Sequence, residues 1–210
     1  MANKQFPYPL YLVISEKDCL HFSLIEVLEQ AIKGGIDIVQ LREKECSFEQ
    51  YLEKAKAVKV ICDAAGIPLI INDNVDVARA VNAWGVHVGT SDMAPSKISA
   101  NGAINIGWSI ESLKQLESSE LKYVQHLGVS PVFSTPTKTN TIIEWGLEGI
   151  KTLKSKTDLP LIAIGGLNES TIPSVLKAGA DSIAVVSAIC ASEDPFNATK
   201  TIKKLIYESK

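Results

Sequence analysis

The chain has 210 residues, 46% of them hydrophobic and 21% charged, and this length predicts one well-buried domain over residues 1–210. A net charge of -3 and a pI near 5.7 argue against broad binding of nucleic acid or anionic membranes, so an anionic ligand would need a local basic cluster. No stretch approaches the roughly 20 apolar residues that span a bilayer, and Met1 to Pro7 lacks an apolar signal region, so we expect a cytoplasmic protein.

Eight short apolar runs predict eight strands. They are continuous rather than alternating, which is typical of strands buried on both faces of a parallel sheet. In chain order they are Leu10 to Ile14, Ile36 to Gln40, Leu69 to Asn72, Val86 to Val88, Ile104 to Ile106, Val124 to Leu127, Leu161 to Ile164 and Ile183 to Val186.

Segments with helical spacing lie between these runs. Two of them open with capping boxes, at Ser23 to Glu26 and at Ser47 to Gln50. Glycines stand where a helix would end before the next strand, at Gly34-Gly35, Gly66, Gly85 and Gly179. The similarity between the stretches 33–39 and 177–185 indicates a repeated strand–helix unit.

This alternation predicts a (β/α)8 TIM barrel, at the short end of the range for that fold. A doubly wound sheet is the alternative. Polar candidate residues follow six of the eight strands, and only a closed barrel brings so many strand ends around one cavity, so the barrel is favoured.

The segment Gln40-Leu-Arg42-Glu43-Lys44 directly follows the second run. Side chains alternate on an extended segment, so Arg42 and Lys44 would point to one side and Glu43 to the other. A guanidinium and an ammonium on one side would suit phosphate oxygens. The alternative is a solvated surface pair.

Carboxylates follow the third and fourth strands. Asp73 and Asp92 would supply oxygen ligands to Mg2+, which takes one or two carboxylates together with substrate phosphate and water. Each of them also precedes a helical segment, so both have an alternative interpretation as helix N-caps.

The last two strands end in candidate phosphate-binding turns. Gly165-Gly166, followed by a predicted helix start, exposes backbone N–H groups, and Val186-Ser187 adds further N–H groups and a hydroxyl. The alternative for the glycines is tight packing of helix on strand. A long hydroxyl-rich connection, Pro131 to Gly146, would close over the substrate and carry Lys138 with it.

Other chemistry is not evident in the sequence. His21, His87 and His126 form no metal-binding or triad pattern, and we interpret His87 and His126 as structural, hydrogen-bonded residues. The cysteines show neither a CxxC pair nor zinc-ligand spacing and are expected to be buried or incidental thiols. They are Cys19, Cys46, Cys62 and Cys190.

In combination, these motifs resemble the thiamine-phosphate synthase family, also called thiamine-phosphate pyrophosphorylase, from about Leu10 to the C-terminal helix. The motifs that carry the resemblance are Gln40 to Lys44, Ile71 to Ala78, Gly85 to Asp92, Gly107 to Ser109, Pro131 to Lys138, Ala163 to Gly166 and Ala184 to Ile189. The family is a (β/α)8 barrel that joins a hydroxymethylpyrimidine diphosphate to a hydroxyethylthiazole phosphate, and it releases diphosphate.

The resemblance implies a role for each candidate residue. Mg2+ would be held by Asp73 and Asp92. The residues expected to hold the pyrimidine diphosphate are Gln40, Arg42, Lys44, Asn72, Ser109 and Lys138, and those expected to receive the thiazole phosphate are Thr135, Thr137, Gly166, Val186 and Ser187. Of these, Arg42, Lys44, Ser109 and Lys138 would be catalytic. Relatives also suggest a homodimer.

Two positions depart from the family pattern. Thr90 stands where many relatives have Gln, and Glu111 stands where some have His. A related thiazole tautomerase would use that histidine for proton transfer without metal, and a non-catalytic barrel that binds thiamine phosphate is a second alternative. The retained basic and acidic cluster favours the synthase over both.

Overall fold

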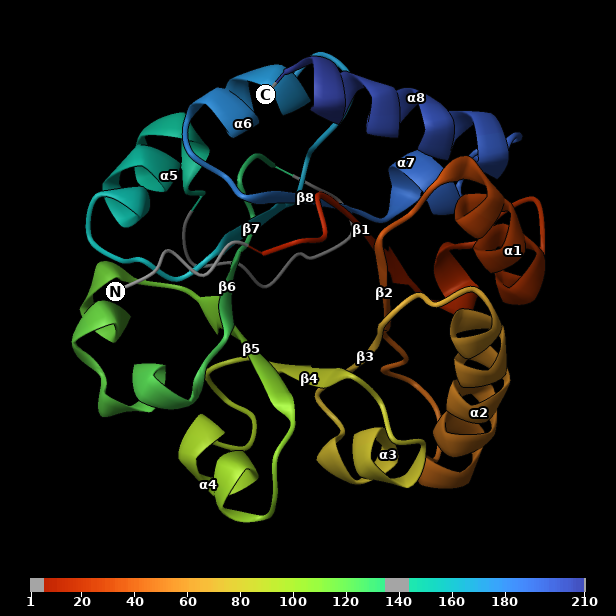
Figure 1. The fold of residues 1–210 in the computed structure, drawn as a ribbon, viewed down its shortest axis with the longest axis horizontal. Helices are drawn as coiled ribbons and strands as arrows, with labels where there is room; N and C mark the ends of the chain where they lie inside the picture. The colour runs from red at the N-terminus through yellow and green to blue at the C-terminus, as the bar shows by residue number, and fades with distance from the viewer. Residues whose placement is uncertain (1–5, 135–143, 210) are drawn as a thin grey trace.

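Eight parallel strands close into one barrel in the computed structural model, which describes residues 6–134 and 144–209. The strands pair in chain order, and β1 pairs with β8 to complete the ring, as Figure 1 shows. The TIM-barrel prediction is therefore confirmed and the doubly wound sheet is wrong. The strands are β1 (Leu10–Ile14), β2 (Ile38–Leu41), β3 (Leu69–Asn72), β4 (Gly85–Val88), β5 (Asn105–Ile110), β6 (His126–Val129), β7 (Leu161–Ile164) and β8 (Ser182–Val185).

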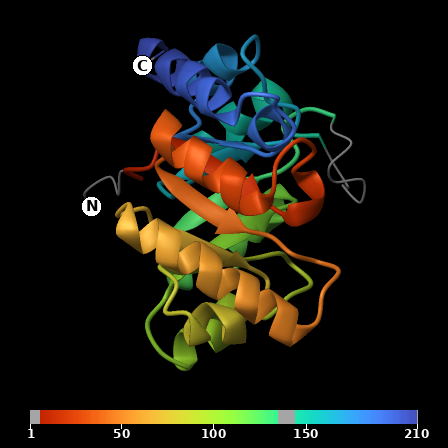
Figure 2. The same ribbon diagram turned by 90° about the vertical axis from the view of Figure 1, so that its right-hand side faces the viewer.

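Helices surround the barrel and bury its outer face (Figures 1 and 2). Two short 3-10 helices, η2 (Leu113–Glu117) and η3 (Ser119–Tyr123), take the place of a helix between β5 and β6, and η1 (Glu16–Asp18) follows β1. The α-helices are α1 (Leu24–Gly34), α2 (Phe48–Ala64), α3 (Val75–Ala80), α4 (Pro95–Ala100), α5 (Gly146–Lys154), α6 (Ile172–Lys177), α7 (Ser187–Cys190) and α8 (Pro195–Glu208). In the described part of the chain, no helix has the length and apolar character required to cross a membrane.

The helix starts follow the predicted caps. Ser23 and Ser47 each accept a hydrogen bond from the third residue of the helix, and each capping box is complete. The predicted helix ends are confirmed at Gly35 and Gly179, both in the left-handed region. Gly85 is different, because it is the first residue of β4. A Cβ there would lie 2.9 Å from the Asn105 carbonyl oxygen, so close strand packing, rather than a helix end, requires this glycine.

The two similar stretches, 33–39 and 177–185, each contain an aspartate that accepts a hydrogen bond from the first residue of a strand. Asp37 accepts a hydrogen bond from the first N–H of β1, at Leu10, and is paired with Lys203. Asp181 accepts one from the first N–H of β7, at Leu161, and is paired with Lys154. Each aspartate satisfies a strand end that the barrel would otherwise leave without a partner.

Strands β5 and β6 differ most from the predicted bounds. β5 continues to Ile110, and β6 begins only at His126. The extension was missed because Gly107 and then Ser109 interrupt the apolar run, whereas the ladder of backbone hydrogen bonds to β6 does not depend on side chains. The extension matters because it brings Ser109 to the same end of the barrel as the other candidate residues.

The barrel interior contains an apolar core around Ile38, Ile70 and Ile162, and a larger core lies between the strands and the helices. The cysteines are free thiols, as expected, and Cys62 and Cys190 are buried.

Candidate active site

A cavity of about 690 Å³ opens at the carboxyl ends of the strands. All described candidate residues line it: Gln40, Arg42, Lys44, Asn72, Asp73, Asp92, Ser109, Gly166, Val186 and Ser187. Catalytic sites of this fold lie at the same end, where loops from many strands meet. Thr135, Thr137 and Lys138 lie outside the described residues.

The end of β2 presents its polar side chains to the cavity. Gln40 is buried, and its side-chain amide donates a hydrogen bond of 2.6 Å to the hydroxyl of Tyr11. Beyond the strand, Arg42 and Lys44 both line the cavity, while the Glu43 carboxylate bonds to Lys54 on α2. The predicted alternation is thus confirmed, although Lys44 remains exposed to solvent at the cavity mouth.

Asp73 has an unusual backbone. Its φ is 60°, in the left-handed region that short polar residues adopt more readily than most, and its N–H donates to the His87 carbonyl. Its carboxylate lies 3.6 Å from the Lys44 ammonium. The N-cap of α3 is Asn74, so the N-cap interpretation of Asp73 is wrong.

Asp92 comes from the loop after β4, and its carboxylate accepts a 2.7 Å hydrogen bond from the N–H of Gly89. The N-cap of α4 is Ala94, so the N-cap interpretation of Asp92 is wrong too. Burial and the adjacent carboxyl group of Asp92 raise the pKa of Asp73, against the opposing effect of Lys44 and Arg42.

This pair of carboxylates fits Mg2+. Two hard oxygen donors within hydrogen-bonding reach of one another repel, and a divalent cation between them would relieve that repulsion. Among residues 6–134 and 144–209, no group of three or more His, Cys, Asp or Glu side chains is placed to hold a metal. A site with two carboxylates suits Mg2+, which completes its shell with phosphate oxygens and water.

A histidine layer lies beneath this part of the cavity. His87 contacts the Ser109 hydroxyl at 2.9 Å, and its ring stacks on that of His126 at 5.9 Å. Gly107 makes room for both rings, because a Cβ there would lie 2.2 Å from His126 Nε2. His87 therefore supports a candidate residue, which the structural interpretation did not foresee.

His126 also differs from its expected role. It is fully buried, and neither ring nitrogen has a hydrogen-bond partner among the described residues. Burial, followed by the charge of His87, lowers its pKa to about 3. The interpretation of His126 as a hydrogen-bonded structural histidine is therefore wrong, and the residue is a neutral part of the cavity floor.

The opposite side of the cavity is made of backbone. Gly165 and Gly166 have φ values of 101° and 66°, and a Cβ at Gly166 would lie 2.8 Å from the Ser134 carbonyl oxygen. These glycines pack on the loop after β6 and not on a helix, since α6 begins only at Ile172. The predicted helix start directly after them is therefore wrong.

A helix does begin directly after β8. Val186 is the N-cap of α7 and has no capping side chain, so the first two N–H groups of α7, at Ser187 and Ala188, remain for a ligand. Val186, Ser187 and Ala188 line the cavity beside the glycine turn. The predicted residues therefore lie together at the cavity, and the second anion site itself stays a prediction.

The two departures from the family pattern contact one another. The Thr90 hydroxyl donates a 2.6 Å hydrogen bond to the Glu111 carboxylate, which lines the cavity. This bond joins the loop that carries Asp92 to the end of β5, close to Ser109. Neither Thr90 nor Glu111 displaces a candidate ligand from the cavity.

Sequence reasoning missed Tyr11 and His87 as parts of this site. Tyr11 lies within an apolar run and His87 within a strand, so nothing local distinguishes them from core residues. The signal that could have found them is the period of two, which places Tyr11, Gln40 and His87 on the inner face of the barrel.

Comparisons with known proteins agree with this geometry. Residues 10–189 match the family model described as thiamine monophosphate synthase. A thiamine-phosphate synthase of Albidiferax ferrireducens is 44% identical over 94% of this chain and 91% of its own, and one of Vibrio parahaemolyticus is 44% identical over 95% and 98%. A solved thiamine phosphate pyrophosphorylase of Pyrococcus furiosus superposes with a TM-score of 0.86 at 31% identity, covering 99% of this chain and 98% of its own.

Proposed function

The chain belongs to the thiamine monophosphate synthase family, a family of transferases, and we propose that it couples a hydroxymethylpyrimidine diphosphate to a hydroxyethylthiazole phosphate with Mg2+. The observation that carries the proposal is the division of one cavity into two halves. Arg42, Lys44, Asp73 and Asp92 lie on one side, and the uncapped start of α7 lies on the other. The two halves suit a diphosphate and a monophosphate.

Arg42 and Lys44 hold the diphosphate in this proposal. The guanidinium offers two parallel donors and the ammonium a compact charge, and both suit phosphate oxygens. Before substrate arrives, Lys44 is paired with Asp73, so Asp73 keeps the ammonium turned toward the cavity. Bound Mg2+, with Asp73 and Asp92 as its protein ligands, would neutralise charge on the departing diphosphate.

The reaction is a dissociative substitution. The bond between the pyrimidine methylene carbon and the diphosphate oxygen breaks with both electrons leaving on oxygen, and the resulting cation accepts the lone pair of the thiazole nitrogen. This step needs no protein nucleophile. Each contact that strengthens as charge moves onto the diphosphate contributes on the order of 2 to 4 kcal/mol.

Gln40, Asn72 and Ser109 are proposed to orient the pyrimidine. The hydrogen bond from Gln40 to Tyr11 fixes the Gln40 amide, and the contact with His87 fixes the Ser109 hydroxyl. The buried, neutral cavity floor around His126 would keep water away from the pyrimidine cation.

The thiazole phosphate is proposed to bind at Gly166, Val186 and Ser187. Backbone N–H groups of these residues would bind the phosphate together, and several are required because each helix N-terminus contributes only about 0.3 to 1 kcal/mol. Thr135, Thr137 and Lys138, outside the described residues, are proposed to complete the two sites.

The alternatives are less well supported. A tautomerase would need an acid or base where Glu111 stands, and the Glu111 carboxylate is engaged by Thr90. A sensor of a monophosphate would have no use for Arg42, Lys44 and the carboxylate pair. We also propose a homodimer in the cytoplasm, which light scattering of the purified protein and fractionation of cells would test.

The deciding experiment is a coupling assay with both phosphorylated heterocycles and Mg2+, repeated with EDTA. We expect thiamine phosphate in the first sample, at least a hundredfold less with EDTA, and recovery when Mg2+ is restored. Product that is indifferent to EDTA would overturn the metal site. The absence of product, with thiazole phosphate still bound in calorimetry, would point to a tautomerase or a sensor.

A further inference from the structure

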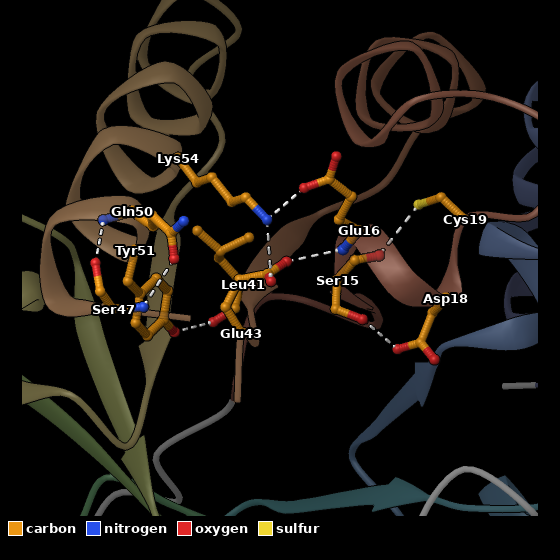
Figure 3. Close-up of polar contacts among 10 residues, drawn as sticks. All are labelled: Ser15, Glu16, Asp18, Cys19, Leu41, Glu43, Ser47, Gln50, Tyr51 and Lys54. Atoms are coloured by element: carbon orange, nitrogen blue, oxygen red, sulfur yellow. Dashed lines mark hydrogen bonds and ion pairs between the residues drawn. The ribbon is translucent and has the colours of Figure 1, made fainter. Parts of the chain in front are cut away.

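The side chain of Glu43 points in a different direction from those of its two cationic neighbours, Arg42 and Lys44. Arg42 and Lys44 line the cavity, whereas Glu43 points between the β1–α1 connection and α2, as Figure 3 shows. Its side chain is only 10% exposed, compared with 84% for Glu45 two residues later. A carboxylate that is buried to this extent needs partners to offset its lost hydration.

Glu43 has two such partners. One carboxylate oxygen accepts a 2.8 Å hydrogen bond from the backbone N–H of Glu16, and the other lies 3.2 Å from the ammonium of Lys54 (Figure 3). Lys54 is paired with the Glu16 carboxylate as well. The three side chains connect η1, the segment after β2, and α2.

The two carboxylates, Glu16 and Glu43, stabilise the positive charge of Lys54 between them. Burial alone would lower the pKa of Lys54, but hydrogen bonds with Glu16 and Glu43 outweigh burial and raise it. Lys54 therefore stays charged throughout the physiological pH range. Its ammonium contacts Glu16 and Glu43, and Lys54 is not among the described residues that line the cavity.

The backbone between Glu43 and the strand is held at one more point. The Tyr51 hydroxyl, also on α2, donates to the Leu41 carbonyl at 2.8 Å and lies 3.1 Å from the Asn72 carbonyl. β2 ends at Leu41, and its ladder with β1 continues for one more bond, from the Arg42 N–H to the Ile14 carbonyl at 2.9 Å. Glu43 and Lys44 follow this bond. A side-chain anchor at Glu43 then decides how the next residues are directed.

We propose that Glu43 is a positioning residue, which, through the Glu16 N–H and Lys54, holds Arg42 and Lys44 toward the diphosphate half of the cavity. The reason is geometric. Alternate side chains of an extended segment point to opposite sides, so fixing Glu43 outward fixes its two neighbours inward. Displacement of a binding group by 1 Å is sufficient to lose most of its contribution. The inference rests on the proposed diphosphate function.

The test uses inorganic pyrophosphate with Mg2+ as the binding probe and the coupling assay as a second readout. For Glu43→Ala we expect about tenfold weaker pyrophosphate binding in calorimetry and about a tenfold higher KM for the pyrimidine diphosphate. The KM for thiazole phosphate should stay within twofold of wild type, because that site is built from β7 and β8. A merely structural defect would move both KM values.

Two further variants separate position from folding. Glu43→Gln keeps an acceptor for the Glu16 N–H and should recover most of the lost affinity. Lys54→Met leaves Glu43 in place and should weaken pyrophosphate binding about threefold, so it remains informative if Glu43→Ala fails to fold. Glu45→Ala is the matched control, because Glu45 lies on the same segment but is exposed and, among the described residues, is paired only with Lys17, at 3.8 Å.

The outcomes are distinguishable. Pyrophosphate affinity of a folded Glu43→Ala equal to that of wild type would overturn the role of Glu43 and leave the proposed function standing. Wild-type protein that neither couples the substrates nor binds pyrophosphate would overturn the proposed function itself. Equal losses in Glu43→Ala and Glu45→Ala would attribute the effect to net charge, and that too would overturn the positioning role.

Discussion

The two halves of the cavity differ in the groups that they present, which are charged side chains in one half and backbone N–H groups in the other. The half around β2, β3 and β4 presents charged side chains, namely Arg42, Lys44, Asp73 and Asp92. The half around β7 and β8 presents two glycines in left-handed conformations and the start of a short helix. Both suit phosphate, and they differ in what holds the binding groups in place.

A side-chain site must be held by other side chains, whereas a backbone site is held by the fold. Lys44 is paired with Asp73, and Glu43, between the two cations, is paired with Lys54. The glycine turn needs no such support, since its N–H directions are set by φ values and by contact with the loop after β6. We therefore expect the charged half to lose its ligand affinity when one side chain is removed. The backbone half should lose its affinity only when an added atom shifts the turn.

The largest effect is expected from Asp92→Ala in the charged half. Loss of a ligand to Mg2+ should lower kcat/KM for coupling by about 10² to 10³, equivalent to roughly 3 to 4 kcal/mol, because charge on the leaving diphosphate is no longer neutralised. The affinity for thiazole phosphate, measured by calorimetry, should be unchanged.

A control distinguishes the metal from the loop. Asp92→Asn retains an oxygen for the Gly89 N–H but carries no charge. Activity of Asp92→Asn close to that of wild type would mean that Asp92 only shapes its loop. A parallel fall in thiazole phosphate affinity would mean that the two halves are not independent.

His126, in the cavity floor beneath the charged half, should make the free energy of unfolding depend on pH. The pKa of His126 is about 3 in the folded protein and about 6.5 when the chain is unfolded, so below pH 6.5 the unfolded state binds a proton that the folded state does not. The free energy of unfolding should therefore fall with pH, and His126 should account for about 2 kcal/mol of the loss at pH 5.

Urea unfolding at pH 7.5 and pH 5 would measure this contribution. His126→Gln should show a smaller loss than wild type by that amount. The exposed His21 provides the control, because His21→Gln should retain the wild-type dependence on pH. Equal losses in all three proteins would show that His126 does not stay neutral on folding.

A smaller effect is expected from Gly166→Ala in the backbone half. The added Cβ meets the Phe133 Cβ and the Ser134 carbonyl oxygen at 2.8 Å, so the turn must shift and its N–H groups with it. We expect the KM for thiazole phosphate to rise about tenfold, a loss of roughly 1.4 kcal/mol in binding, with little change in pyrophosphate affinity.

Gly66→Ala is a matched control for this substitution. Its φ of 68° is close to the 66° of Gly166, but nothing lies within 4 Å of the new Cβ and the residue follows α2. It should lose stability through φ alone, about 1 to 2 kcal/mol, with both KM values unchanged. If Gly166→Ala behaves in the same way, the glycine turn does not hold phosphate.

Much of the charged half could be predicted from the sequence because its signals are local. An apolar run followed by Arg42 and Lys44 at a spacing of two is visible in five residues. The closed barrel followed from strand count and alternation. The N-cap alternatives for Asp73 and Asp92 were wrong because the backbone turns one or two residues later, a choice fixed by tertiary packing.

The parts that could not be predicted depend on contacts between distant strands. His126 meets Gly107 only through the register of β5 with β6, and the bond from the Glu16 N–H to Glu43 joins two connections 27 residues apart. Neither appears as a pattern along the chain. Hence the candidate binding residues could be named from the sequence, and the residues that contact and hold them could not.

The pairing of β1 with β8 also determines when the cavity can exist during synthesis. Leu12 finds its partner Val185 only after most of the chain has been made. At ribosomal rates of about 5 to 20 residues per second, β1 waits on the order of 10 to 30 seconds for it. The side-chain half is translated first and the backbone half last, so the charged side chains of a nascent chain are made well before the ring that encloses them.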